Sequence, residues 1–349
     1  MTWQQQLADS ITSPEQLAGH FDIDPAPLRA VATRYPLLIT PHYLGLIDQP
    51  GDPIWRQCVP DLSELAVDDL PADSLNEQAY APVPAIVHRY PDRALLLVSG
   101  DCAGYCRFCT RKSRIGTRRL CFSRAEIDEG IAYISATAEI RDVILTGGDP
   151  LLLNDAYLGE ILNRIHQVDH VEMIRIGSRV PVTLPDRITP ELCRLLSHFR
   201  PLYLNTHFNH PRELTAESAA ACARLADAGL PLGNQTVLLN GVNDSSGVMI
   251  ALCRGLLKMR VRPYYLHHLD QARGTSHFRV PVERGLKIIA GMRGQVSGLG
   301  IPQYVIDPPG GEGKVALLPE NLLEIGDSIR VRTSSGVVVL PNQRRCEDF

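Results

Sequence analysis

Three cysteines stand close together in the run Cys102-Ala-Gly-Tyr-Cys106-Arg-Phe-Cys109. Thiolates at this spacing, with three residues and then two between them, can hold three irons of a four-iron, four-sulfur cluster. The fourth iron is then left without a protein ligand, so it can bind a small molecule and pass it an electron. Zinc prefers paired Cys-x-x-Cys units and four ligands, and a disulfide framework belongs to small secreted chains. The spacing therefore predicts that Cys102, Cys106 and Cys109 bind iron.

Two glycine-rich runs are further candidates for chemistry. In Asp307-Pro-Pro-Gly-Gly-Glu-Gly-Lys314 the lysine is followed by Val315 and the internal spacing is not that of a phosphate-binding loop. A lysine at the end of such a run can reach into a barrel mouth, and lysine is the usual attachment point of pyridoxal phosphate, although most lysines on such loops are simply solvated. The second run, Gly147-Gly148-Asp149-Pro150, is either an ordinary turn after a strand or a place where the backbone comes close to a ligand.

Short apolar runs alternate with helical patterns from about residue 94 onward, which predicts parallel βα units. The expected strands are 95–98, 143–146, 173–176, 202–205, 235–238 and 263–266. Six such units favour an α/β fold with a full or partial (β/α)6 barrel, and no Gly-x-Gly-x-x-Gly follows the first strand as a nucleotide-binding open sheet would require. Active groups of such barrels gather at the carboxyl ends of the strands, where the cysteine loop and both glycine-rich runs are expected.

Regions on either side of the barrel have a different character. Residues 1–84 are predicted to form a helical, proline-interrupted leader, in which Ser13 to Gln16 resembles a capping box. The barrel is expected over 85–310, with a second capping box at Ser123 to Glu126 and a helix from Thr215 to Ala228. A short C-terminal extension over 311–349 contains a predicted hairpin around Ser335-Gly336, which could contact a partner subunit.

Composition restricts the class of protein. The 349 residues carry a net charge of −4, so no strong positive field draws the chain to nucleic acid. No stretch of about 18 uncharged apolar residues predicts a membrane span, and the N-terminus lacks the pattern of a signal peptide. Nine cysteines, an odd number in a large chain, fit a reducing cytoplasm.

The cysteine spacing is typical of radical S-adenosylmethionine enzymes, and residues 85–320 resemble the lysine 2,3-aminomutase family. The matching runs are His88-Arg-Tyr-Pro-Asp-Arg93, Cys102 to Lys112, Thr146-Gly-Gly-Asp-Pro-Leu151, Thr206-His-Phe-Asn-His210, Gly233-Asn-Gln-Thr236 and Asp307 to Lys314. The resemblance implies a partial radical S-adenosylmethionine barrel and an amino acid 2,3-aminomutase, an isomerase. Its implied cofactors are a [4Fe-4S] cluster, S-adenosylmethionine and pyridoxal phosphate.

The same resemblance implies roles for individual residues. Lys314 matches the lysine that holds pyridoxal phosphate, and Arg89 and Arg93 match arginines near the cofactor phosphate. The residues implied to lie beside S-adenosylmethionine are Gly147, Gly148, Asp149, His207 and Gln235.

Three charged residues are implied to bind the substrate. Arg111 matches an arginine that holds the substrate carboxylate, a task that suits its planar fork. Asp270 and Asp307 match two carboxylates at the far end of the substrate, and such a pair would repel unless a cation lay between them. This predicts a basic amino acid rather than glutamate, with lysine and arginine both possible.

Two departures from the family pattern affect what the resemblance implies. His267 stands where many relatives have a tyrosine. Asn243-Asp244-Ser245 lacks the cysteine that binds zinc in members with a longer C-terminal segment, so no zinc is expected.

The expected activity is conversion of L-lysine to β-lysine, with an electron donor such as flavodoxin or ferredoxin and a homo-oligomeric state. The alternatives are an arginine 2,3-aminomutase, an enzyme that makes β-lysine for elongation factor P modification, and a non-catalytic iron–sulfur protein. The intact Lys314, Arg111, Asp270 and Asp307 argue against the last of these.

Overall fold

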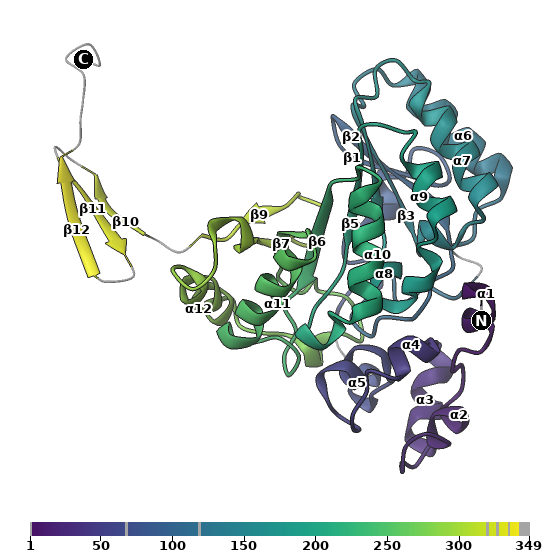
Figure 1. The fold of residues 1–349 in the computed structure, drawn as a ribbon, viewed down its shortest axis with the longest axis horizontal. Helices are drawn as coiled ribbons and strands as arrows, with labels where there is room; N and C mark the ends of the chain where they lie inside the picture. The colour runs from purple at the N-terminus through teal and green to yellow at the C-terminus, as the bar shows by residue number, and fades with distance from the viewer. Residues whose placement is uncertain are drawn as a thin grey trace.

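A nine-stranded sheet runs through the computed structural model in the order β1 to β9 (Figure 1). The structure describes residues 2–66, 69–117, 120–318, 321–325, 328–333 and 336–341. Strands β2 to β8 are parallel, and β1 and β9 pair antiparallel at the two edges. The strands are β1 (Ile86–Tyr90), β2 (Arg93–Ser99), β3 (Asp142–Gly147), β4 (Met173–Gly177), β5 (Leu202–Thr206), β6 (Leu232–Val237), β7 (Arg262–His267), β8 (Gln303–Ile306) and β9 (Val315–Ala316).

Helices connect each parallel strand to the next and lie on the outside of the sheet (Figure 1). They are α6 (Arg124–Ala136), α7 (Asp155–His166), α8 (Val180–Thr183), α9 (Pro190–Leu196), α10 (Ala216–Asp227), α11 (Ser246–Lys258) and α12 (Val282–Met292). Each longer helix buries one stripe; on α7 the buried residues Leu158, Ile161, Leu162 and Ile165 recur at helical spacing. Within the described ranges β1 and β9 do not pair with each other, so the sheet is a barrel that stays open on one side.

The six predicted βα units are confirmed, and the structure adds strands at both edges. The predicted capping box at Ser123 is present on α6. The helix predicted from Thr215 to Ala228 is α10, of which Thr215 is the N-cap and Ala228 the C-cap. Strand β8 was not predicted; it directly follows Pro302, and its four residues include only three apolar ones. Strand β1 was also not predicted. It pairs antiparallel with β2 through a tight hairpin, in which Tyr90 lies opposite Arg93.

The leader packs against the barrel and against the cysteine loop. It contains α1 (Trp3–Ala8), α2 (Pro14–Ala18), α3 (Ala26–Arg34), α4 (Pro41–Leu44), α5 (Pro53–Cys58) and two 3-10 helices (Leu62–Leu65 and Glu77–Tyr80). The predicted capping box at Ser13 is present on α2. Buried leader residues such as Leu17, Ile39 and Ile54 belong to the same hydrophobic core as the barrel strands. The boundary between leader and barrel at residue 84 stays a prediction.

Backbone hydrogen bonds join the leader to the cysteine loop. The amide of Tyr105 donates to the carbonyl of Leu38 at 3.0 Å, and the amide of Arg107 donates to the carbonyl of Gln57 at 2.9 Å. The side chain of Arg107 also donates to the buried carboxylate of Glu64 at 2.9 and 2.5 Å. The leader therefore fixes the path of the loop that carries the three cysteines.

The C-terminal extension forms a separate sheet of β10 (Leu322–Ile325), β11 (Ser328–Thr333) and β12 (Gly336–Pro341), which lies apart from the barrel (Figure 1). The predicted hairpin is confirmed by antiparallel pairing of β11 with β12, in which Thr333 lies opposite Gly336. Ser335, in the predicted turn, is outside the described residues. None of the described helices has the length and apolar character needed to cross a lipid bilayer.

Candidate active site

A cavity of about 510 Å³ occupies the interior of the open barrel and is lined by most of the predicted site residues. The predicted residues that line it are Arg89, Arg93, Arg111, His207, Gln235, Asp270, Asp307 and Lys314. The three cysteines, Gly147, Gly148 and Asp149 are not among its lining residues. The structure thus gathers side chains from both edges of the sheet, from the intervening strands and from the leader around one space.

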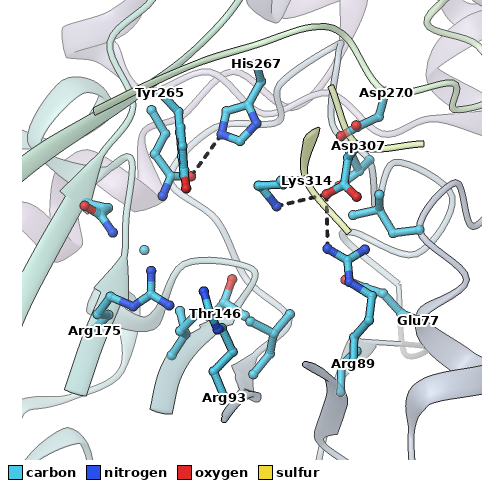
Figure 2. A pocket seen from close by; sticks show the side chains of 18 of the residues that line it. Glu77, Arg89, Arg93, Thr146, Arg175, Tyr265, His267, Asp270, Asp307 and Lys314 are labelled. Carbon is cyan, nitrogen blue, oxygen red and sulfur yellow. Dashed lines mark hydrogen bonds and ion pairs between the residues drawn. The ribbon is translucent and has the colours of Figure 1, made fainter. Parts of the chain in front are cut away.

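Lys314, Asp307 and Arg89 form a charged group at one side of this cavity (Figure 2). Asp307 Oδ2 accepts hydrogen bonds from Lys314 Nζ at 2.9 Å and from Arg89 Nη2 at 3.2 Å. Tyr90, in the hairpin between β1 and β2, accepts the backbone amide of Lys314 on its hydroxyl at 2.9 Å. These contacts direct Lys314 to the wall of the cavity, where its side chain remains 31% exposed.

Asp270 lies beside Asp307 and gives the site an excess of buried oxygen acceptors. Among the described residues, Oδ1 of Asp270 and Oδ1 of Asp307 are both buried and accept no hydrogen bond. Burial, together with the negative charge of Asp307, raises the pKa of Asp270 to about 7. Burial opposes ionisation of Asp307 as well, but the positive charges of Lys314 and Arg89 outweigh it and lower the pKa of that carboxyl.

Two further cations, Arg93 and Arg175, enter the cavity away from Asp270 (Figure 2). Arg175 was not predicted; it lies on β4 and donates to Asp142 at 3.0 and 2.5 Å. Arg93 packs on the ring of Tyr90, with its guanidinium carbon 4.8 Å from the ring centroid. Arg89 also contacts this ring, and its Nη2 donates both to the Tyr90 hydroxyl and to Asp307 at 3.2 Å. Arg93 donates to Asp92 instead, so the two arginines predicted to share a phosphate have different partners.

Arg111 lines the cavity, but its fork is already engaged. It donates to Glu77 through Nε at 3.1 and 3.0 Å and through Nη2 at 2.6 Å, while Nη1 donates to Thr146 and to the carbonyl of Gly147. Burial raises the pKa of Glu77, but the charges of Arg111 and Arg114 prevail and lower it to about 2. Glu77 comes from a 3-10 helix of the leader, and nothing in its sequence context pointed to the site.

The three cysteines fit a cluster by donor chemistry and proximity. Cys102, Cys106 and Cys109 are partly exposed free thiols on one loop. Burial raises the pKa of Cys109 to about 11, with a further contribution from the neighbouring Cys106. Burial, the charge of Asp149 and then the other two thiols raise the pKa of Cys102. Among the described residues no group of three or more His, Cys, Asp or Glu is already arranged to hold a metal ion. The thiols therefore lie near one another without forming a preformed cage, and iron would favour their thiolate forms.

Gly147 and Gly148 permit two strand-end loops to touch. A Cβ atom on Gly147 would lie 2.3 Å from the carbonyl oxygen of Ser99, and one on Gly148 would lie 2.2 Å from that of Asp101. The carboxylate of Asp149 is turned inward, where it accepts hydrogen bonds from Ser178 and from backbone amides including that of Arg179. These residues thus position the start of the cysteine loop, and contact of their backbone with S-adenosylmethionine stays a prediction.

His207 and Gln235 lie on the cavity wall together with His267. The ring of His267 lies 3.4 Å from Gln235 Oε1, and His207 Nε2 is 3.1 Å from Asn209 Oδ1. Burial, with Lys314 nearby, lowers the pKa of His267 to about 3, so this residue is neutral. Ser245, which stands in the position of the family's zinc cysteine, caps α11 with its hydroxyl; absence of zinc remains a prediction.

Replacement of Gly148 by alanine should displace the cysteine loop, because the added Cβ would overlap the backbone of Asp101. Forced overpacking of this kind costs about 1–3 kcal/mol. We expect Gly148→Ala to lose most of its iron after anaerobic reconstitution, measured as iron per chain. Gly298→Ala is the matched control, since no atom lies within 4 Å of the added carbon there. Full iron content in Gly148→Ala would contradict this role.

The raised pKa of Asp270 also affects stability. Its pKa is about 7 in the folded chain, against an ordinary value of 3.8 for an aspartate in the unfolded chain. As the pH rises from about 4 to about 7, the folded state therefore retains a proton that the unfolded state has released. Stability is lost over that window, by on the order of a few kcal/mol. Asp270→Asn should therefore raise the free energy of unfolding of the ligand-free protein at pH 8 and change it little at pH 4, as measured in urea. Asp227→Asn, at an exposed position, is the control and should show no such pH dependence. If Asp270→Asn lowered the free energy of unfolding at pH 8, repulsion between Asp270 and Asp307 would be refuted.

Comparison with known proteins places the chain in a family. Residues 96–252 match the family model of the radical SAM superfamily, and residues 289–342 match that of lysine-2,3-aminomutase. An L-lysine 2,3-aminomutase from Fusobacterium nucleatum is 45% identical over 96% of this chain and 81% of its own length. One from Clostridium subterminale is 46% identical over 96% of this chain and 82% of its own. A glutamate 2,3-aminomutase from Clostridioides difficile is 43% identical over 96% of this chain and 81% of its own.

A solved radical SAM methyltransferase from Sphaerobacter thermophilus is 21% identical, with a TM-score of 0.45 over 64% of this chain and 68% of that one. The sequence similarity to the curated relatives extends over nearly the whole chain, leader included. It excludes the interpretation of a non-catalytic iron–sulfur protein and implies an isomerase that uses a [4Fe-4S] cluster, S-adenosylmethionine and pyridoxal phosphate. The chain belongs to the lysine 2,3-aminomutase family of radical S-adenosylmethionine enzymes.

Proposed function

We propose that this aminomutase converts L-lysine to β-lysine by moving the amino group from the α-carbon to the β-carbon. Sequence similarity does not choose the substrate, because relatives named for lysine and for glutamate are 45% and 43% identical to the chain. The observation that supports lysine is the buried pair Asp270 and Asp307, each with one oxygen that has no hydrogen-bond partner in the described part of the chain.

Charge balance explains why this pair favours a cation. When Lys314 leaves Asp307 to hold a cofactor, the two carboxylates retain Arg89 as their near cation. The ammonium group at the end of a lysine side chain would replace the charge that Lys314 withdraws. A glutamate side chain would instead add a third carboxylate, and the two buried aspartates would repel it.

The opposite end of the substrate would be held by Arg111. Because Glu77 already accepts from its Nε and Nη2, a substrate carboxylate must share this guanidinium or displace Glu77. The two anchors, Arg111 at the α-carboxylate and the aspartates at the far end, would orient the carbon chain between them. Fixing both ends in this way is a positioning contribution to catalysis.

The remaining lining residues would hold the cofactors. Lys314 is the proposed attachment of pyridoxal phosphate, with Arg93 and Arg89 as candidates for its phosphate, and Cys102, Cys106 and Cys109 are the proposed iron ligands. His207, Gln235 and the backbone of Gly147 to Asp149 are proposed to border S-adenosylmethionine. Bound cluster and S-adenosylmethionine supply one-electron hydrogen abstraction, and bound pyridoxal phosphate supplies the π system through which nitrogen can move between neighbouring carbons.

Arginine is the alternative substrate, since a guanidinium would also balance two carboxylates, and β-lysine made for elongation factor P modification is an alternative purpose of the same reaction.

We propose a flavodoxin or ferredoxin as the electron donor; failure of both to reduce the cluster would exclude them. We also propose a cytoplasmic location, which the eight free cysteines in the described ranges support. Appearance of the protein in a periplasmic or secreted fraction would exclude it.

The C-terminal sheet supports a homo-oligomer. The register places six apolar residues on one of its faces: Leu322, Ile325, Ile329, Val331, Val338 and Leu340. Four of them are more than two-fifths exposed. A three-stranded sheet with such an uncovered face needs a partner, and we propose a second copy. A chain ending at residue 318 should sediment with fewer copies per particle than the full chain. The same number of copies for both chains would count against this interface.

The substrate proposal is tested by anaerobic incubation of the reconstituted enzyme with lysine, arginine and glutamate, with products identified by mass spectrometry. Lysine should be the preferred substrate. Loss of one partner of a desolvated charge pair costs about 2–5 kcal/mol, so Asp270→Asn and Asp307→Asn should each lower kcat/KM for lysine by tens- to thousands-fold. Pyridoxal phosphate should remain trapped on Lys314 by borohydride in both variants.

Asp227→Asn, in an exposed ion pair, is the matched control and should retain parental turnover. A parent enzyme that prefers glutamate, or Asn variants that keep near-parental rates with lysine, would overturn the substrate assignment. Trapping of the cofactor on another lysine would overturn the role of Lys314 alone.

A further inference from the structure

Arg179 is a buried cation that sequence reasoning missed and that the proposed chemistry does not use. It lies two residues beyond the end of β4, and its side chain is only 11% exposed. Its Nη1 atom donates to Cys106 Sγ at 2.7 Å, and its Nε donates to the carbonyl of His207 at 3.2 Å. A guanidinium thus lies against a thiol that is proposed to bind iron.

Three acceptors fix the orientation of this guanidinium. Nη2 donates to Gln57 Oε1 at 2.6 Å, to Glu213 Oε1 at 2.8 Å and to the hydroxyl of Tyr43 at 3.0 Å. With Nη2 held on one side, Nη1 is directed at Cys106 on the other. The geometry therefore depends on residues from α4, α5 and a 3-10 helix after β5, not only on the loop that carries Arg179.

The acceptors are themselves held in place. The hydroxyl of Tyr43 donates to Glu213 Oε1 at 2.6 Å, and Glu213 Oε2 accepts the amides of Asn209 and His210. Gln57 Oε1 also accepts from Asn209 at 2.9 Å. Two of the three groups that orient Arg179, Tyr43 and Gln57, belong to the leader, so the leader determines what the thiol of Cys106 contacts.

We propose that Arg179 is a positioning residue that donates an N–H···S hydrogen bond to Cys106 and raises the reduction potential of the cluster. Hydrogen bonds to cluster sulfurs and local net charge are among the determinants of such potentials. Reduction adds one electron to the cluster, and a fixed positive charge stabilises the more negative product. The electron comes from the external donor, and no bond or proton is exchanged. The inference rests on the proposal that the three cysteines bind the cluster.

The test is a redox titration of the anaerobically reconstituted full chain, without S-adenosylmethionine, followed by electron paramagnetic resonance. In Arg179→Gln the cluster should become at least tenfold harder to reduce, a shift of 59 mV to more negative potential for one electron. Arg179→Lys, which keeps a charge but not the fork, should shift less. Arg187→Lys is the matched control, because Arg187 is buried even more deeply and donates to Leu151 and Asp155 instead of a cysteine; its potential should not shift.

An unchanged potential in Arg179→Gln with full iron content would overturn the proposal. If that variant also bound S-adenosylmethionine more weakly, Arg179 would instead be a ligand of the methionine carboxylate. If Arg179→Gln binds no cluster, the same redox titration is made on Arg179→Lys and Tyr43→Phe. A cluster potential equal to that of the parent in both variants would overturn the inference. A parent chain that forms no cluster would contradict the assignment of the cysteines, which is a separate failure.

Discussion

The carboxylate of Asp307 determines the electrostatics of the cavity, because it binds two cations while a second buried carboxylate lies beside it. Lys314 and Arg89 both donate to Oδ2, and their charges keep Asp307 ionised despite its burial. Asp270 forms no ion pair with a described residue, and burial together with the charge of Asp307 raises its pKa to about 7. The negative charge of these carboxylates is therefore balanced only while Lys314 stays on Asp307. Any use of Lys314 elsewhere leaves a place for another cation, which connects the cofactor site to substrate choice.

The fold serves this site by holding loops from distant segments together. The open barrel brings strand ends β3 to β8 to one side, and its edge strands carry Arg89, Tyr90 and the loop to Lys314. The leader contributes from outside the barrel: its carbonyls at Leu38 and Gln57 accept amides of the cysteine loop, and Glu77 engages Arg111. Because these contacts hold the cysteine loop and Arg111, the leader is part of the site rather than an appendage.

The sequence predicted those features that depend on local pattern. The six βα units, the capping box at Ser123, the helix beginning at Thr215 and the C-terminal hairpin follow from periodicity and cap chemistry, and eight predicted side chains line one cavity. It did not predict β8, which directly follows Pro302. It also did not predict Glu77, Arg175 and Arg179, whose roles arise from partners far away in the chain. Arg179 could have been flagged as a strand-end residue, since the other strand ends were considered. The pairing of Arg89 with Asp307 could not be foreseen, because it depends on how the two edges of the sheet approach.

The central claim, that Asp270 and Asp307 select a cationic side chain, is tested most directly by comparing L-lysine with 2-aminoheptanoate. This analogue has a methyl group in place of the ammonium at the end of the same chain. A site built around buried polar groups rejects an analogue that leaves them unpaired by about 10⁴-fold or more. We expect a ratio of kcat/KM of that order in favour of lysine. Turnover of 2-aminoheptanoate within tenfold of lysine would contradict it, because the two carboxylates would then not depend on a cation from the substrate.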